Sequence, residues 1–531
     1  MIIGIDFGTC FSSAAIMNGF IPVTSYIKDT TGVGIPSLFM YSQEQGKELF
    51  GEDCVTGEAF RHEADIVRNM KRTVREDPEN ISMKVSSGGK DYVLSDIIKM
   101  YLSYLIDEIR KGAEKSGEFG STDIEAVTIT APVGIAQGQM MATDYNQFLQ
   151  DTVMEITGLP KEKVRVIQEP VAAAISYLYS EDVRKQYDGK LKVMVFDLGG
   201  GTLDVTVMEH DPDAMTYEIM AKEGDLNLGG NDWDNLLADA VMKKIGITGF
   251  DDPEEEAGFR RLVTKLKIDL TMGTDSMIFF THDGEDKFTR FSRQEFEDAT
   301  RGLLDRALYT VDKTLESLAG GMEGIDRIVL VGGSSNMPQI KTGLSEHFPS
   351  FDPESIMVFD PSKAIAKGAA LYSKFNCETG RSGEGAKIID ICSTTYGFDS
   401  LYNGMEESVY NMIYKGMPFD SEGCISVKSD TSFIPLRDSQ TAVSFMVYES
   451  ASQKGDGFDG NWFHLGNGEA QNGMEVTIPI PRSYYGRATE FVMWAEFALD
   501  ENGILELIIT DPHGNRLGYT STTVNDAVSR R

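Results

Sequence analysis

The sequence has few of the residues that build disulfide frameworks or zinc clusters. Its 531 residues include six scattered histidines, without the spacing of metal ligands, and five cysteines. The cysteines are odd in number and far apart in sequence, so they predict neither a disulfide framework nor a zinc site. Apolar runs are also short, and none approaches the length needed to span a bilayer. The cysteines are Cys10, Cys54, Cys377, Cys392 and Cys424.

Basic residues are in the minority. Lys and Arg number 49 against 83 Asp and Glu, which gives a formal net charge of -34. This charge opposes non-specific attraction to nucleic acid and to anionic lipid, so we expect neither nucleic acid nor a membrane among the partners. Met1 to Asp6 lack the basic start and long apolar core of a secretory signal. The expected location is therefore cytoplasmic.

The order of apolar segments predicts an α/β protein with a second, β-rich domain. Strand-like and helical runs alternate up to about residue 375. Residues 376–387 lose the apolar periodicity and are rich in glycine and charge, which predicts a flexible linker. In residues 388–531, short alternating segments such as 442–448 and 503–510 lie between turn residues. They predict an all-β domain.

Two helices are indicated by local patterns. Apolar residues recur at helical spacing from Ile97 to Ile109, as one buried face requires. Ser292 followed by Glu295 is a capping box that predicts the start of another helix. Both are interpreted as structural elements rather than as sites.

Two acidic, glycine-rich turns indicate phosphate binding. Asp6 ends a predicted strand from Ile2 to Ile5, and Asp197 ends another from Leu191 to Phe196. Glycine lets backbone N–H groups approach phosphate oxygens, and a threonine hydroxyl adds a donor. The two turns are versions of one device, so the chain looks internally duplicated, and neither fits the Walker pattern. Their residues are Gly8, Thr9 and Cys10 in the first turn, and Gly199, Gly200, Gly201, Thr202 and Asp204 in the second.

The acidic residues predict a bound cation. Asp6, Asp197, Asp204 and Glu169 would face an anionic triphosphate, which is tolerable only if a cation lies between them. Magnesium is the natural ion, because it takes oxygen ligands and is commonly held by carboxylates together with phosphates. Glu169 precedes Pro170 and so lies at a predicted helix start, with the positive end of the helix facing the site.

A third glycine turn completes the predicted site. Gly332, Gly333 and Ser334 follow a predicted strand from Ile328 to Val331 and can cradle a nucleoside sugar or phosphate. Any one of these turns alone is more often an ordinary hairpin or loop, and their order along the chain is what favours a site. By contrast, residues 455–460 fit G-x-G-x-x-G but open no helix, which predicts a surface loop.

In this order the motifs resemble those of the actin-like ATPase superfamily, and within it the seventy-kilodalton heat-shock (DnaK-type) chaperones. The resemblance runs along nearly the whole chain. It implies a duplicated, ribonuclease H-like ATPase domain with two lobes, about 1–185 and 186–375. A smaller peptide-binding β-sandwich would follow, without the helical lid of the family. The motifs are Gly4–Thr9, Lys71–Arg72, Ala126–Pro132, Glu169–Tyr177, Val195–Val205, Leu228–Asp234, Ile328–Ser334, Lys367–Ala370, Met446–Glu449 and Leu499–Leu505.

The resemblance also implies roles for individual residues. Asp6, Asp197 and Glu169 would hold magnesium, mainly through water. Asp204 and Lys71 would position the attacking water, an arrangement that suits in-line phosphoryl transfer. Together with Thr202, the residues Lys71, Glu169, Asp197 and Asp204 form the predicted catalytic set. The expected nucleotide contacts are Gly8, Thr9, Cys10, Gly199, Gly200, Gly201, Gly229, Gly230, Lys267, Ile268, Gly332, Gly333, Ser334 and Asn336.

Several positions depart from the family pattern. In the adenine pocket only Lys267 matches, while Thr264, Ile268 and Asn336 replace charged side chains. The lost guanidinium stacking is worth on the order of 1 kcal/mol. Cys10 replaces a second threonine, and Met140 stands where the family has an arginine eight residues after Pro132. Without a lid, a bound peptide is expected to escape quickly.

We therefore expect a magnesium-dependent ATPase that converts ATP to ADP and phosphate and couples its nucleotide state to polypeptide binding. The expected partners are extended or unfolded polypeptides, a dedicated client, and a co-chaperone or exchange factor. Three alternatives stay open: a nucleotide-binding scaffold with little or no hydrolysis, a small-molecule kinase of the same fold, and a filament-forming protein. The altered adenine pocket favours the first of these.

Overall fold

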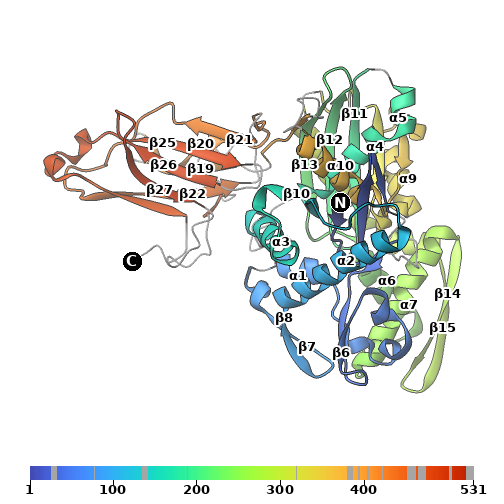
Figure 1. The fold of residues 1–531 in the computed structure, drawn as a ribbon. Helices are drawn as coiled ribbons and strands as arrows, with labels where there is room; N and C mark the ends of the chain where they lie inside the picture. The colour runs from blue at the N-terminus through green and yellow to red at the C-terminus, as the bar shows by residue number, and fades with distance from the viewer. Residues whose placement is uncertain are drawn as a thin grey trace. The chain divides into compact units, whose positions relative to one another are not determined.

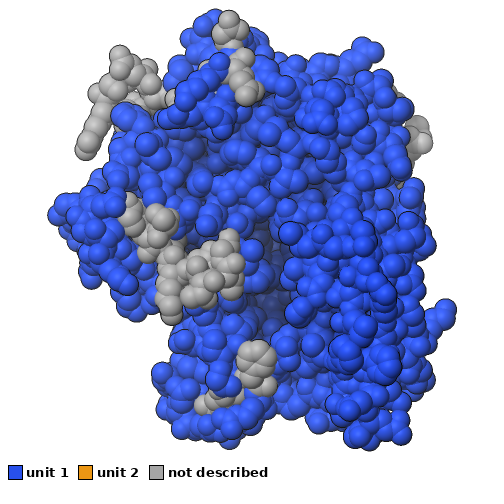
Figure 2. All heavy atoms as spheres, turned by 90° about the vertical axis from the view of Figure 1, so that its right-hand side faces the viewer, with its two compact units in different colours: residues 1–217, 222–387 blue, residues 218–221, 388–531 orange. Residues whose placement is uncertain are grey.

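The computed structural model divides the chain into two compact units. Unit 1 comprises residues 1–217 and 222–387, and unit 2 comprises residues 218–221 and 388–531. Figure 2 presents a face of unit 1 that is hollowed near its middle. The structure describes residues 1–521 except 25–32, 77, 134–141, 188, 319, 379–386, 393–394, 403–405, 421–422, 451–461, 465–473 and 501–504.

Unit 1 contains two larger sheets that repeat one pattern (Figure 1). In the first sheet, β1 pairs antiparallel with β2 and parallel with β9, which pairs parallel with β10. In the second, β11 pairs antiparallel with β12 and parallel with β16, which pairs parallel with β17. Such a repeat agrees with an internal duplication, and the assignment of two lobes stays a prediction. The strands of the first sheet are β1 (Ile2–Asp6), β2 (Phe11–Asn18), β3 (Ile21–Val23), β4 (Ile35–Pro36), β9 (Ala126–Ala131) and β10 (Val164–Gln168). Those of the second that lie wholly or mainly in unit 1 are β11 (Leu191–Leu198), β12 (Leu203–Asp211), β13 (Thr216–Asp225), β16 (Arg327–Val331) and β17 (Ile356–Val358).

Helices cover these sheets, as the alternating sequence pattern predicts, and the chain is of mixed α/β class. The predicted helix around Ile97 is confirmed, since its apolar face is fully buried in α2. The capping box is confirmed too: Glu295 N donates to Ser292 Oγ at 3.2 Å at the start of α8. The helices are α1 (Met70–Glu76), α2 (Leu94–Ser116), α3 (Ala142–Thr157), α4 (Glu169–Tyr179), α5 (Glu181–Gln186), α6 (Gly230–Ile245), α7 (Pro253–Met272), α8 (Arg293–Glu316), α9 (Pro338–His347) and α10 (Ala364–Glu378).

The last helix of unit 1 packs directly on its first strand. A Cβ added to Gly4 in β1 would lie 2.2 Å from the backbone N of Ala370 in α10. A Cβ added to Gly368 in α10 would lie 1.7 Å from the backbone O of Ala172 in α4. Because no side chain fits at either glycine, α10 approaches β1 and α4 backbone to backbone. Residues far apart in sequence are thereby joined into one core.

Among its described residues, unit 1 also has three two-stranded hairpins and several 3-10 helices. The β14–β15 hairpin packs one face on α7 through Phe280 and Phe259, whose ring centroids lie 5.1 Å apart. The hairpins are β5 (Phe39–Ser42) with β6 (Lys47–Phe50), β7 (Lys84–Ser87) with β8 (Lys90–Val93), and β14 (Asp275–His282) with β15 (Glu285–Ser292). The 3-10 helices used below are η2 (Gly57–Arg61), η3 (Glu63–Asp65) and η6 (Gly333–Asn336).

Within its described residues, unit 2 has strands and only short 3-10 helices. One sheet has the order β20-β19-β22-β23 with β24 also paired to β22, and the other has the order β21-β25-β26-β27. Phe398 lies in the core, within 5.3 Å of the ring centroid of Phe445. The strands are β19 (Thr395–Tyr402), β20 (Glu406–Ile413), β21 (Cys424–Lys428), β22 (Ala442–Ser450), β23 (Trp462–His464), β24 (Glu475–Pro479), β25 (Trp494–Asp500), β26 (Leu505–Thr510) and β27 (Arg516–Ser521).

The edges of the predicted linker are corrected by the structure. Helix α10 continues to Glu378, so residues 376–378 are helical, and Lys387 already begins strand β18 (Lys387–Ile389). Composition alone predicted the wrong linker ends, because a short polar segment can still continue a helix or strand that neighbouring residues hold in place. The rest of the predicted linker, Met140 and the predicted loop at 455–460 lie outside the described residues. No helix among the described residues is long and apolar enough to cross a membrane.

Candidate functional site

Four carboxylates from separate elements come together in unit 1. Asp6 ends β1, and Glu169 begins α4. Asp197 in β11 lies directly opposite Asp204 in β12 in the antiparallel register. Asp197, Asp204 and Glu169 are buried, with at most 5% of each residue exposed. The sequence motifs that supplied these acids are therefore neighbours in space.

This crowding raises the pKa values of the aspartates. Burial, followed by the charge of Glu169, raises the pKa of Asp6 to about 7. Burial and the same glutamate raise the pKa values of Asp197 and Asp204 well above their ordinary range. Each aspartate is thus costly to ionise when the site holds protein groups alone. A cation among the carboxylates would remove that cost.

Lys71 on α1 supplies a buried positive charge to this carboxylate cluster. Only 2% of it is exposed, and its Nζ donates to Glu169 Oε1. Burial opposes the charged form, but Glu169, Tyr145 and Asp6 outweigh it and raise the pKa of Lys71. The lysine therefore stays protonated. Sequence reasoning proposed this residue through its motif alone, and the geometry now places it at the acids.

Arg75 was missed by the sequence reasoning. It lies one helical turn after Lys71, is 3% exposed, and its guanidinium lies 4.9 Å from the ring centroid of Tyr145. Asp204 and Glu169 both interact with its charge, although burial lowers the pKa of Arg75. The i, i+4 spacing from Lys71 was a usable signal, since such residues share one helix face.

Two carboxylate oxygens of the cluster have no hydrogen-bond partner in the described part of the chain. They are Asp197 Oδ2 and Asp204 Oδ2, and both are buried. The other oxygen of Asp204 accepts from the backbone N–H of Val133 at 2.7 Å. Buried acceptors are rarely left without a donor or a cation. This donor set, all oxygen and all anionic, fits a hard divalent cation such as magnesium.

The glycine turns meet beside these acids. A Cβ added to Gly201 would lie 2.7 Å from Thr9 Oγ1, and one added to Gly200 would lie 2.3 Å from Cys10 Sγ. A Cβ added to Gly229 would lie 2.5 Å from the backbone of Gly201. The first turn, the second turn and the start of α6 therefore converge. They approach so closely at these glycines that no side chain fits between them. Such a cradle of backbone N–H groups suits phosphate.

Backbone hydrogen bonds fix this arrangement. Gly199 N donates to the carbonyl of Thr202 at 3.0 Å, which closes the second turn. Gly230 N donates to the carbonyl of Gly199 at 2.9 Å, which ties α6 to that turn. In the first turn, a Cβ added to Gly8 would lie 2.1 Å from the carbonyl O of Phe11. Gly8, Gly199 and Gly230 are among the expected nucleotide contacts, and Thr202 belongs to the predicted catalytic set.

The third glycine turn lies next to the second. Gly332 has φ +79°, and a Cβ there would lie 2.5 Å from Asp197 Oδ1. The Leu198 N–H donates to Ser335 Oγ at 3.2 Å. A Cβ added to Gly230 would lie 2.2 Å from Ser334 Oγ, so the start of α6 faces this turn. Gly333, which begins η6, has open space at its Cβ position.

The residues expected to contact the base are less closely joined. Lys267 Nζ donates to the carbonyl of Gly230 and to Asp234 Oδ2, both at 2.8 Å. Ile268 is 56% exposed, and Asn336, also exposed, donates to the carbonyl of Gly333 at 3.0 Å. The side chains of Lys267 and Asn336 therefore contact the backbone of the glycine segments, whereas Ile268 is largely exposed.

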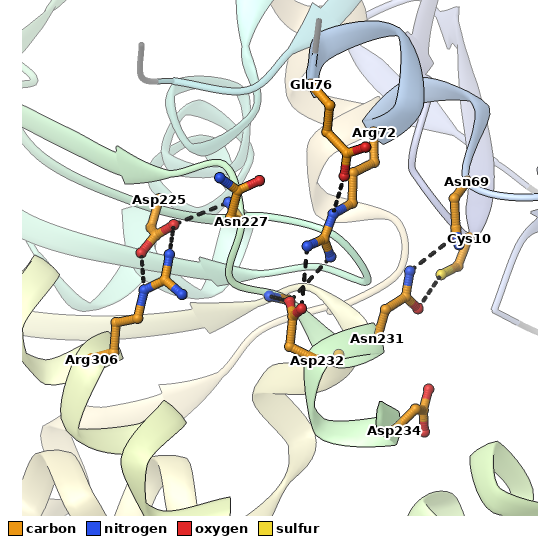
Figure 3. A network of polar contacts seen from close by, with 12 residues as sticks. Cys10, Asn69, Arg72, Glu76, Asp225, Asn227, Asn231, Asp232, Asp234 and Arg306 are labelled. Atoms are coloured by element: carbon orange, nitrogen blue, oxygen red, sulfur yellow. Dashed lines mark hydrogen bonds and ion pairs between the residues drawn. The ribbon is translucent and has the colours of Figure 1, made fainter. Parts of the chain in front are cut away.

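Polar contacts hold α6 to the segments around Asn69 and Arg72 (Figure 3). Cys10 Sγ donates to Asn231 Oδ1 at 3.3 Å, and Asn231 Nδ2 donates to Asn69 Oδ1 at 2.9 Å. Arg72 donates from both terminal nitrogens to Asp232, at 3.1 and 3.2 Å. Sequence reasoning did not find these pairs, because 160 to 221 residues separate the partners.

Comparison with known proteins gives one consistent result. The family model described as "Hsp70 protein" matches residues 2–456. Curated proteins named "Chaperone protein DnaK" are similar to this chain. The one from Cenarchaeum symbiosum is 29% identical over 463 residues, and the one from Nitrosopumilus maritimus is 29% identical over 462. The one from Elusimicrobium minutum is 30% identical over 462 residues.

Each match covers 84% of this chain. The matched region covers 63%, 66% and 67% of the three relatives, respectively. The chain therefore spans about two-thirds of the length of these relatives.

Proposed function

The chain belongs to the Hsp70 family, and on that premise we propose that it is a magnesium-dependent ATPase whose nucleotide state controls polypeptide binding. The observation that carries the proposal is the convergence of two acid-ended glycine turns around Lys71. Asp6 and Asp197 would hold magnesium together with Glu169. A family match that extends to residue 456 supports a chaperone-type ATPase over a small-molecule kinase of the same superfamily.

The metal assignment is supported by the orphaned oxygens of Asp197 and Asp204. A magnesium ion would supply charge neutralisation between these carboxylates and the phosphates, and would hold the terminal phosphate group in place. The chain contributes acids whose positions are set by β1, β11 and α4 before any ligand arrives. Such preorganisation avoids a reorganisation cost during the reaction.

Lys71 and Asp204 are proposed to position the attacking water. The ammonium of Lys71 is fixed by Glu169 and stays charged, so it can donate to an oxygen without losing its own position. Asp204 Oδ1 is occupied by the Val133 N–H, which leaves Oδ2 to accept a hydrogen bond from water. In-line transfer depends mainly on such positioning and on charge stabilisation. Thr9 and Thr202, both buried at the turns, would donate to the terminal phosphates.

Unit 2 is the proposed polypeptide-binding part. In support, it exposes several large apolar side chains: Ile434 is 55% exposed and Leu436 is 47% exposed. Its sheets also end in edge strands, for example β20 and β27 among the described strands. An edge strand can pair with an extended backbone, while apolar side chains select apolar segments. Extended or unfolded polypeptide clients would bind through such surfaces.

The direct experiment is phosphate release by the purified chain with ATP, in magnesium or in excess chelator. We expect magnesium-dependent turnover that Lys71→Ala and Asp197→Ala abolish. Lys185→Ala is the matched control, because Lys185 lies exposed on α5, where it pairs with the equally exposed Glu181. Turnover that is equal in all variants would reject the assigned site. Nucleotide binding without turnover would favour the scaffold alternative, which the exposed Ile268 and Asn336 support.

A further inference from the structure

We propose that His62, Asp65 and Glu254 form a binding site for a divalent transition-metal ion such as Zn²⁺, separate from the carboxylate cluster. One ligand atom from each residue lies within 4.8 Å of the other two. His62 stands between η2 and η3, Asp65 ends η3, and Glu254 lies in the first turn of α7. Two segments about 190 residues apart thus supply the three groups.

The donor set suits a borderline metal ion. One imidazole nitrogen and two carboxylate oxygens are a common three-ligand combination for zinc and its neighbours, with water in the remaining position. With metal–ligand bonds of about 2.0–2.2 Å, two ligand atoms of a tetrahedral ion lie about 3.3–3.6 Å apart. The three ligand atoms already lie within 4.8 Å of one another, so modest side-chain movements bring them to that spacing.

Nothing in the described part of the chain competes for two of the three ligands. The ring of His62 and the carboxylate of Asp65 make no hydrogen bond or ion pair there, although both are half-buried. Glu254 uses one oxygen, Oε2, to accept the Ala64 N–H at 3.0 Å. Its second oxygen remains for a metal. Groups of this kind gain more from a cation than groups already paired.

The backbone around the three ligands is fixed independently of any ion. Ser87 Oγ donates to the carbonyl of Asp65 at 2.6 Å. Asp252 caps α7 by accepting from Glu254 N at 3.0 Å. The positive charge of Arg261 is compensated by Glu63, whose Oε1 accepts from its Nε at 2.7 Å. Because Glu63 neutralises the Arg261 guanidinium, this positive charge repels a bound cation less. The backbone hydrogen bonds at Asp65 and Glu254 mean that the site is largely preorganised.

A second group of similar composition is a poorer candidate and gives a control. His282, Glu255 and Asp283 also bring ligand atoms within 4.8 Å. His282 Nδ1, however, already lies 2.5 Å from Glu255 Oε1, and Asp283 has a side chain that is 78% exposed. Metal binding there would first break an existing hydrogen bond. We therefore assign the ion to His62 rather than to His282.

The test is zinc titration of the full chain by calorimetry, without nucleotide and with excess magnesium present to occupy hard oxygen sites. We expect wild type and His282→Ala to bind one equivalent of Zn²⁺ with equal affinity. His62→Ala and Glu254→Gln should weaken that binding at least tenfold. Glu254→Gln keeps an acceptor for Ala64 N–H, so it separates ligand loss from misfolding, which circular dichroism also checks.

Cobalt provides a second readout of the same site. Bound Co²⁺ should absorb in the visible region without a thiolate charge-transfer band, because the ligands are nitrogen and oxygen. The proposal is overturned if wild type binds no zinc, if His62→Ala binds it unchanged, or if a thiolate band appears. Since no step requires ATP, this result is independent of the proposed ATPase activity.

Discussion

Lys71 is a charge that the protein, rather than water, must stabilise. Its ammonium and the Glu169 carboxylate are 2% and 7% exposed, respectively, so each is the main compensation for the other. Removing one partner of a buried ion pair typically costs about 3–5 kcal/mol, because the other charge is left uncompensated. We therefore predict that Lys71→Met lowers the free energy of unfolding by about that amount and abolishes turnover.

Urea denaturation and phosphate release measure the two effects. The double variant Lys71→Met with Glu169→Gln should recover much of the stability but none of the activity. If Lys71→Met is as stable as wild type, the lysine is not paired as described. The surface variant Lys185→Ala should change neither quantity, since exposed ion pairs contribute about 0–1 kcal/mol.

His210 gives a prediction about pH. Burial lowers its pKa below 6.5, although the Thr216 carbonyl and Asp211 act in the opposite direction. Its ring stacks on Tyr217 with centroids 4.3 Å apart. Below pH 6.5 the unfolded state binds more protons at this position than the folded state, so stability falls as the pH falls from about 7 to about 5.

We predict that His210→Phe reduces this loss of stability while keeping the stacked ring. Chemical denaturation at several pH values between 5 and 7.5 measures the slope. His513→Gln is the control, since His513 lies exposed in the turn before β27. An identical slope for wild type and His210→Phe would contradict the assignment.

At the residue scale, the sequence singled out the acids that the structure brings together, but not the polar pairs around them. Asp6 and Asp197 could be found because each lies at or beside the end of a strand, directly before a glycine-rich turn. Glu169 could be found from the proline that follows it. The Arg72–Asp232 pair could not, because neither residue differs in its local pattern from an ordinary surface charge. Only the fold decides which distant charge a side chain meets.

At the scale of elements, the glycines at the start of α6 show that close packing, rather than helix propensity, requires glycine there. A Cβ at Gly229 would meet the backbone of Gly201, which has no side chain that could move aside. We predict that Gly229→Ala weakens nucleotide binding at least tenfold, as measured by fluorescent nucleotide titration. Gly258→Ala in α7 is the matched control, because nothing lies within 4 Å of that Cβ position. That control should bind normally and gain up to about 1 kcal/mol of stability.

The Arg72–Asp232 pair joins α1 to α6 and is the element-scale test of the polar contacts in Figure 3. Asp232 also accepts the Gly229 N–H at 2.8 Å, so the same carboxylate orders the turn beside the cradle. We predict a coupling free energy of about 0.5–3 kcal/mol in a double-mutant cycle of Arg72→Met and Asp232→Asn, measured by denaturation. Strictly additive effects would mean that the pair does not form in solution.

Element types were predictable where periodicity was long, as in α2, whose apolar face spans several turns. Element ends were less so. Helix α10 continues past residue 375 because its start is held against β1 and α4, and its polar end follows. Composition alone does not show which helix ends are stabilised by tertiary contacts.

At the scale of the whole molecule, the proposed function requires that two ligands influence each other. If nucleotide and polypeptide are coupled, ATP and ADP must give different peptide affinities, by a factor of about 5–150 for typical coupling energies. We predict this difference for a fluorescent extended peptide titrated into the full chain by anisotropy. Asp197→Ala should bind the peptide with one affinity whichever nucleotide is present. If wild type binds the peptide with equal affinity in ATP and in ADP, nucleotide state does not control polypeptide binding, and that part of the proposed function is wrong.

The sequence resemblance predicted the family, and the comparisons confirm it. The order of motifs sufficed, because it places each turn after a strand. The two lobes, the β-sandwich and the roles of the site residues remain predictions. The metal group at His62 was not foreseen, since two of its ligands are separated from the third by nearly two hundred residues.

The packing of α10 on β1 has a consequence for synthesis on the ribosome. Gly4 is made long before the residues whose backbone it meets, Ala366 and Ala370. The opening strand of unit 1 must therefore wait for more than three hundred and fifty further residues before its neighbour exists. Contacts between such distant segments slow folding. Until then, apolar side chains of this strand such as Ile3 and Ile5, which are fully buried in the folded chain, lack part of their cover.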